Sequence, residues 1–65
     1  MNNRIEELRT LRSIRQEELA KALGVSRQTI SSLENGRYNP SILLAHRLAQ
    51  YFGLTIEEVF LFEEE

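Results

Sequence analysis

The stretch "LAKALGVSRQTISSLENGRYNPS" runs from Leu19 to Ser41 and decides the fold of this 65-residue chain. Apolar residues recur at helical spacing before Gly24, and glycine supplies the left-handed conformation in which many helices end. Ser26 can cap the start of a second helix, about residues 26–34, which Asn35 and Gly36 end. Because only a short turn beginning with glycine separates them, the two helices are predicted to form a helix-turn-helix.

The second of these helices presents an unusual polar face. In a helix-turn-helix the first helix crosses the phosphate backbone and the second lies in the major groove. That groove displays hydrogen-bond acceptors, amine donors and the thymine methyl group, which arginine, glutamine, serine and threonine are suited to read. The face holds these residue types and no carboxylate: Arg27, Gln28, Thr29, Ser31 and Ser32. The pattern favours base reading in double-stranded DNA, whereas the same residues on an arbitrary helix are most often solvated surface.

Helical patterns also flank this motif. Near the start, apolar residues recur at three-residue steps after a cap at Asn2 or Asn3; they are Ile5, Leu8 and Leu11. A longer helix is predicted between a Ser41 cap and Gly53, with Pro40 fixing its entry. Its apolar stripe consists of Leu44, Ala45, Leu48, Ala49 and Phe52.

A short last helix follows. Thr55 and Glu58 form a capping box that opens a helix ending at about Val59 or Phe60. The residues after it are too few to decide between a fraying turn and an extended segment, and both remain open for the tail 61–65. Short connections join the five predicted helices, so we expect residues 1–65 to form a single all-α domain.

Charge is distributed unevenly along the chain. The net charge is −2, but residues 1–47 hold all eight basic residues with five glutamates, whereas residues 48–65 hold five glutamates and no basic residue. This asymmetry suggests that the first part meets a polyanion. The alternative is that eight basic residues in this length are ordinary surface.

Composition excludes several functions. The chain has no cysteine and a single histidine, His46, so we expect no metal site, no cofactor and no small-molecule ligand, and we place His46 at the surface or an interface. Paired glutamates near the end lack the pocket that acid–base catalysis needs, so an enzyme is not expected. No apolar run is long enough to cross a membrane and no secretory signal precedes the domain, so a cytoplasmic location is expected.

The stretch "RQEELAKALGVSRQTISSLENGRYNPS", from Arg15 to Ser41, resembles the lambda-repressor and Cro type of helix-turn-helix regulator, the xenobiotic-response-element family. "LRTLR" before it and "LAQYFGLTIEEVF" after it extend the resemblance over essentially the whole chain. The resemblance implies a five-helix lambda-repressor-like domain that binds double-stranded DNA as a transcriptional regulator. A dimeric repressor on a palindromic operator is the first hypothesis. An antitoxin-like protein-binding partner with autoregulatory DNA binding is the alternative.

The resemblance also implies roles for individual residues. Base contacts are expected from Arg27, Gln28, Ser31 and Ser32. Contacts to the DNA backbone are expected from Gln16, Arg15, Ser26, Thr29, Asn35, Arg37, Tyr38 and Asn39. For Tyr38, covering the edge of the core is an equal alternative. Glu34 resembles a structural residue whose carboxylate ties the end of the recognition helix to neighbouring basic groups.

One residue departs from the family pattern. The position before Gln16 is usually a serine or threonine that caps the helix, and here it is Arg15. Losing a cap costs about 1 kcal/mol. Either Ser13 caps the helix from further back, or Arg15 recovers the loss by contacting a phosphate.

Some large apolar residues have no evident place in a monomer core. Exposed apolar residues that cluster mark an interface, and family members often dimerise through this region. We therefore expect a homodimer interface formed by Leu43, Phe60, Leu61 and Phe62. The alternative is a hydrophobic tail that folds over its own core.

Overall fold

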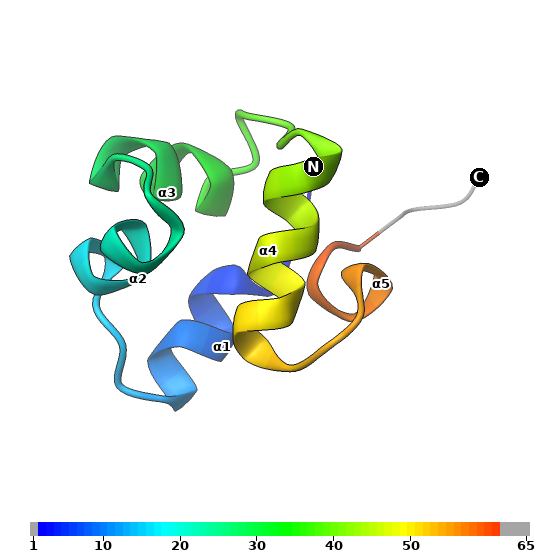
Figure 1. Cartoon of the computed structure of the whole chain (residues 1–65), viewed down its shortest axis with the longest axis horizontal. Helices are drawn as coiled ribbons and strands as arrows, with labels where there is room; N and C mark the ends of the chain where they lie inside the picture. Colours follow the sequence, from blue (N-terminus) through cyan, green and yellow to red (C-terminus); the bar gives the residue numbers. More distant parts are fainter. Residues whose placement is uncertain (1, 62–65) are drawn as a thin grey trace.

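The computed structural model describes residues 2–61 and confirms the all-α, lambda-repressor-like fold (Figure 1). Five helices follow in the expected order: α1 (Ile5–Leu11), α2 (Gln16–Leu23), α3 (Arg27–Glu34), α4 (Ile42–Phe52) and α5 (Ile56–Val59). In Figure 1, α2 and α3 lie together on one side of the molecule, α4 stands beside them, and α5 lies on the far side of α4. Phe62 and the rest of the predicted tail lie outside the described residues.

The turn between α2 and α3 has the geometry predicted for it. Gly24 follows α2 with φ +73° and ψ +30°, the left-handed conformation that glycine adopts without steric cost. Ser26 is extended, and its Oγ accepts a hydrogen bond of 3.1 Å from the Thr29 backbone N–H, which caps α3. Residues within the turn therefore end α2 and cap α3, as the sequence predicts.

One hydrophobic core joins all five helices. All the predicted apolar residues of α2, α3 and α4 are buried in it. The complete core consists of Ile5, Leu8, Leu19, Ala20, Leu23, Ile30, Leu33, Leu44, Ala45, Leu48, Ala49, Phe52, Val59 and Phe60. Leu11 does not join it and is 73% exposed. Three-residue steps drift around a helix of 3.6 residues per turn, and Leu11 is the last residue of α1, so it turns away from the core.

The two ends of the described chain pair with each other. Asn3 and Phe60 form an antiparallel β-bridge, flanked by hydrogen bonds of 2.8 Å from Arg4 N–H to the Val59 carbonyl and from Leu61 N–H to the Asn2 carbonyl. The segment after α5 is thus extended at Phe60, where φ is −107° and ψ is 130°. The expectation that Phe60 lies at a dimer interface is wrong, because this side chain is 1% exposed and packs in its own core.

No helix among residues 2–61 has the length and apolar character needed to cross a bilayer. In the same part of the chain, acidic and histidine side chains nowhere gather in a group of three or more that could hold a metal ion.

Candidate nucleic-acid interface

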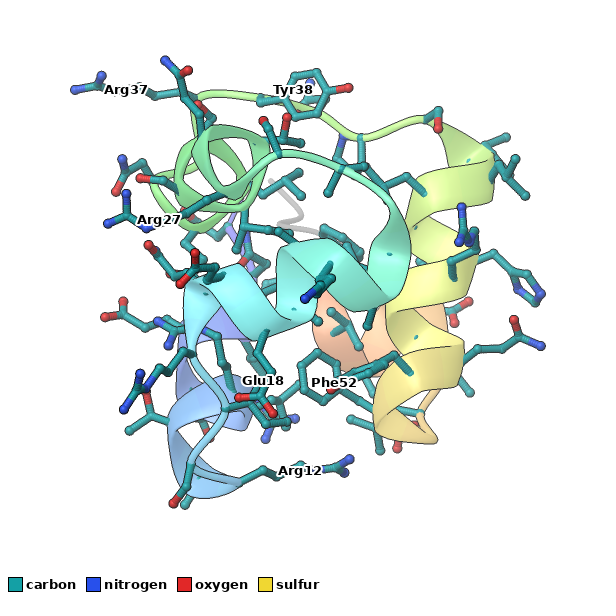
Figure 2. All side chains as sticks on the ribbon, turned by 60° about the vertical axis from the view of Figure 1, so that its left-hand side comes forward. Arg12, Glu18, Arg27, Arg37, Tyr38 and Phe52 are labelled. Carbon is teal, nitrogen blue, oxygen red and sulfur yellow. The ribbon has the colours of Figure 1, made fainter. Side chains whose placement is uncertain are left out.

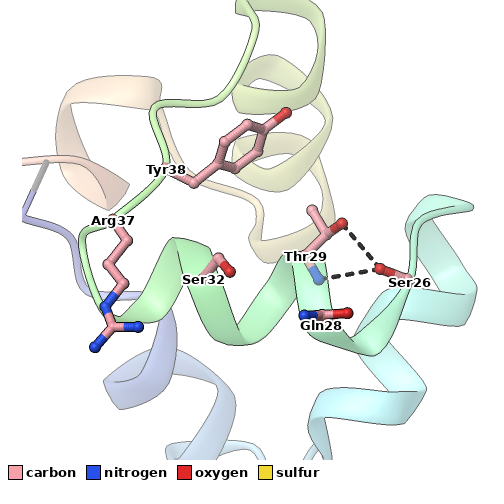
Figure 3. A pocket seen from close by; sticks show the side chains of 6 residues that line it. All are labelled: Ser26, Gln28, Thr29, Ser32, Arg37 and Tyr38. Carbon is pink, nitrogen blue, oxygen red and sulfur yellow. Dashed lines mark hydrogen bonds between the residues drawn. The ribbon is translucent and has the colours of Figure 1, made fainter.

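The outer face of α3 and the loop after it enclose a shallow, open hollow of about 400 Å³. Two predicted base-reading residues, Gln28 and Ser32, line it together with four predicted backbone-contacting residues, Ser26, Thr29, Arg37 and Tyr38. Figure 3 shows Gln28 and Ser32 on successive turns of α3, with Tyr38 above the helix and Arg37 beyond its end. Amide, hydroxyl and guanidinium groups therefore converge on one surface.

The four residues expected to contact bases divide into two pairs. Gln28 and Ser32 line the hollow, whereas Arg27 and Ser31 do not. The reason is the four-residue spacing within each pair, which places Arg27 and Ser31 on the adjoining side of the helix. Arg27 is exposed and Ser31 is half-buried. Arg27 and Arg37 extend toward the same side of the molecule (Figure 2).

The first turn of α3 is held by hydroxyl groups. Besides capping the helix, the Ser26 Oγ lies 2.9 Å from the Thr29 Oγ1 in a hydrogen bond. Both side chains were expected to contact the DNA backbone, and both already have a partner within the chain. Their bonds fix the orientation of the first turn, where the N-terminal residues of a recognition helix meet base edges.

The other end of α3 is braced by a nearly buried ion pair. The Arg9 Nε donates to Glu34 Oε2 at 2.8 Å, the Arg9 Nη2 to Oε1 at 3.2 Å, and the Gln16 Nε2 to Oε1 at 2.9 Å. The side chains of Arg9 and Glu34 are only 14% and 5% exposed. Hydrogen bonding to Glu34 raises the pKa of Arg9 above its ordinary value. The structural role expected of Glu34 is confirmed.

The sequence did not predict the roles of two arginines of the α1 region, Arg9 and Arg12, in holding the helices together. Arg9 lies 25 positions before Glu34, and its Nη1 also donates to the Ile14 carbonyl at 2.9 Å. Arg12 donates from Nη2 to the carbonyl of Phe52, the last residue of α4, and lies 5.2 Å from the Phe52 ring centroid. In the sequence, Arg9 and Arg12 only follow apolar residues of α1, and this position does not specify a partner for either arginine.

Arg15 occupies the first position before α2, as predicted. Its backbone is extended and its N–H donates to the Glu18 Oε1 at 3.3 Å, which is half of a capping box. Arginine has no acceptor to complete the box. Ser13 lies two positions earlier in a left-handed conformation with φ +57°. No side chain in the described part of the chain caps the start of α2, so the alternative that Ser13 caps it is wrong.

The remaining predicted residues are accessible. Asn35, Arg37 and Asn39 are exposed in and beside the loop after α3, and Tyr38 is 43% exposed. Leu43 and Leu61, expected at a dimer interface, are 66% and 45% exposed. Ile42, which was not predicted, is 85% exposed beside Leu43. His46 is on the exposed face of α4, as expected.

The second helix of this helix-turn-helix is capped, braced and polar on its outer face. This arrangement is typical of DNA-binding regulators, whose second helix enters the major groove. The helix-turn-helix family profile matches residues 5–59 of the chain. The chain belongs to this family, in its lambda-repressor/Cro type, whose members are DNA-binding transcriptional regulators and not enzymes.

Relatives with assigned names agree with this class. An uncharacterised helix-turn-helix transcriptional regulator of Methanocaldococcus jannaschii is 48% identical over the whole of this chain and 98% of its own length. The transcriptional activator BcrR of Enterococcus faecalis is 36% identical over 97% of this chain and 31% of its own length. The cryptic phage CTXphi transcriptional repressor RstR of Vibrio cholerae is 33% identical over 89% and 52%.

Proposed function

We propose that the chain is a dimeric repressor that binds a palindromic operator and reads it with α3. The observation that carries this proposal is the outer face of α3, where Gln28 and Ser32 line one open hollow together with Arg37 and Tyr38. Glutamine pairs with adenine through two hydrogen bonds, and serine is suited to either donor or acceptor edges. Arg27 and Ser31, on the adjoining side of the helix, complete the set of base contacts.

Contacts to the phosphate backbone surround this face. Arg37, Asn35 and Asn39 follow α3 and are exposed, as is Arg15 at the start of α2. Gln16 is the first residue of α2, beside Arg15, and its side-chain amide donates to Glu34. Together with Ser26, Thr29 and Tyr38, these groups fix the register of the protein on the duplex without reading its sequence.

A second copy of the chain sets the spacing of the two half-sites. Among the described residues Leu43 and Leu61 are 66% and 45% exposed, which supports an interface at these positions. We extend the proposed interface to Phe62, which lies outside the described residues. A twofold dimer carries two recognition helices about 34 Å apart, which matches half-sites one helical turn apart. Occupying such an operator blocks transcription, the role carried in the name of the Vibrio cholerae relative.

The test is selection of bound duplexes from a random DNA library by the purified chain at fixed, near-physiological salt. The proposal predicts enrichment of a palindrome whose half-sites lie about ten base pairs apart. Binding without enrichment that disappears on adding salt would show phosphate attraction alone and overturn the proposal. A protein partner would then be the next candidate ligand.

Arg15→Ser separates two roles of the same position. A serine in this extended position can accept from the Glu18 N–H and complete the capping box, so the free energy of unfolding should rise by about 1 kcal/mol. The lost phosphate contact should reduce the slope of log affinity against log salt by roughly one. Urea denaturation and a salt titration measure the two effects. An unchanged salt slope would remove Arg15 from the backbone contacts.

Leu43→Glu tests the dimer. A carboxylate at this exposed position of α4 leaves the core untouched but places like charges in the proposed twofold interface. Light scattering after size-exclusion chromatography should show a shift from dimer to monomer, with the circular dichroism spectrum unchanged. A wild-type chain that is already monomeric at high concentration would contradict the proposed interface.

A further inference from the structure

The side chain of Asn3 connects the paired chain ends to the recognition helix. Its Nδ2 donates to the Leu33 carbonyl at 2.7 Å, and its Oδ1 accepts from the Ile5 N–H at 3.0 Å. Leu33 belongs to the last turn of α3, whereas Ile5 begins α1. The backbone of Asn3 forms the β-bridge with Phe60. The half-buried Asn3 therefore links the start of α1 to the last turn of α3 and to the segment after α5.

The bond from Asn3 reaches one of the last carbonyls of α3. The last carbonyls of a helix have no intrahelical partner and are otherwise satisfied by turns, side chains or water. The Leu33 carbonyl accepts from the Gly36 N–H at 3.0 Å in the turn after α3, and the Asn3 amide supplies a second donor. Glu34, the next residue, is held by Arg9 and Gln16. The last turn of α3 is thus fixed from two sides.

We propose that Asn3 is a positioning residue for DNA reading, which sets the orientation of α3 by anchoring its last turn to the paired chain ends. Asn3 itself is not proposed to touch a base. It acts through Leu33, and a looser last turn changes where Gln28 and Ser32 point when the helix enters the groove. This inference rests on the proposed function for its effect on binding, whereas the anchoring itself is a property of the free protein.

The test is Asn3→Asp. Aspartate has nearly the same shape and keeps an oxygen that can accept from the Ile5 N–H, but it cannot donate to the Leu33 carbonyl. Gln50→Glu makes the same amide-to-carboxylate change at an exposed position near the end of α4 and serves as the matched control. Both full-length variants are examined by amide NMR without DNA and by affinity for selected and random duplexes at one salt concentration.

In the free protein, Asn3→Asp should shift the Gly36 amide resonance and accelerate amide exchange in the last turn of α3, and Gln50→Glu should do neither. An unchanged last turn in Asn3→Asp would overturn the anchoring, whatever the DNA results. With DNA, the affinity for selected duplexes divided by the affinity for random duplexes should fall roughly tenfold. The reason is that loss of the bond to Leu33 loosens the last turn of α3, the helix proposed to read bases.

A variant that remains folded with an unchanged ratio would overturn the positioning role while leaving the proposed function intact. A wild-type chain without any preference between selected and random duplexes would instead overturn the proposed function. In that case the NMR result still decides whether Asn3 anchors α3. The two failures are therefore distinguishable.

Discussion

Replacing Arg9 by methionine is expected to lower the free energy of unfolding by about 3 kcal/mol. The substitution keeps much of the aliphatic stem but leaves the Glu34 carboxylate, whose side chain is 5% exposed, without its cation. Removing one partner of a buried pair is costly because the remaining charge keeps its desolvation penalty. Urea denaturation followed by circular dichroism measures the change.

Two further variants make this prediction specific. Arg4→Met removes a guanidinium that pairs with Glu7 at 3.2 Å with side chains 36% and 57% exposed, so its effect should be much smaller. Adding Glu34→Met to Arg9→Met should recover part of the lost stability, since no unpaired carboxylate remains. If the double variant lost the sum of both single effects, the pair would not interact as the structure shows.

Gln28→Ala is expected to lower the affinity for the selected operator by roughly tenfold to hundredfold. Gln28 lies on the first turn of α3, and its amide lines the hollow where base edges are proposed to enter. Affinity for random duplexes should barely change, because phosphate contacts supply nonspecific binding. Titrations of selected and random duplexes at the same salt concentration measure the two affinities.

Gln50→Ala is the matched control for this prediction. It removes the same side chain from an exposed position on α4, outside the proposed interface with DNA, and should leave both affinities unchanged. Equal losses on selected and random duplexes for Gln28→Ala would mean that Gln28 assists binding without reading a base. A lower free energy of unfolding in the same variant would mean that part of the lost affinity comes from destabilisation of the fold, and urea denaturation checks this.

The parts of the fold that depend on local sequence were predictable. The Ser26 cap, the Gly24 helix end and the α4 apolar stripe each depend on residues that are close in the sequence. The structure confirms all three. Capping and periodicity act over one or two helical turns, so a pattern in the sequence suffices to find them.

The long-range contacts were not predictable from such patterns. The β-bridge between Phe60 and Asn3 joins the two ends of the described chain, and no periodicity in the sequence predicts it, so local patterns leave Phe60 without a place in the core. Arg9 and Asn3, which brace the last turn of α3, were missed for the same reason. The polar outer face of α3 is predictable from its residue types and from the family resemblance. The hollow that Gln28 and Ser32 share with Arg37 and Tyr38 depends on the path of the loop after α3, which no such pattern specifies.

If α3 reads bases, a substitution on its outer face should change which base the protein prefers, and not only weaken binding. Operator selection with the wild type and with Gln28→Arg, side by side at one salt concentration, is the decisive measurement. Arginine pairs with guanine where glutamine pairs with adenine. We expect one base pair in each half-site to change from A·T to G·C while the rest of the site is retained. Enrichment of the same site by both proteins would contradict it.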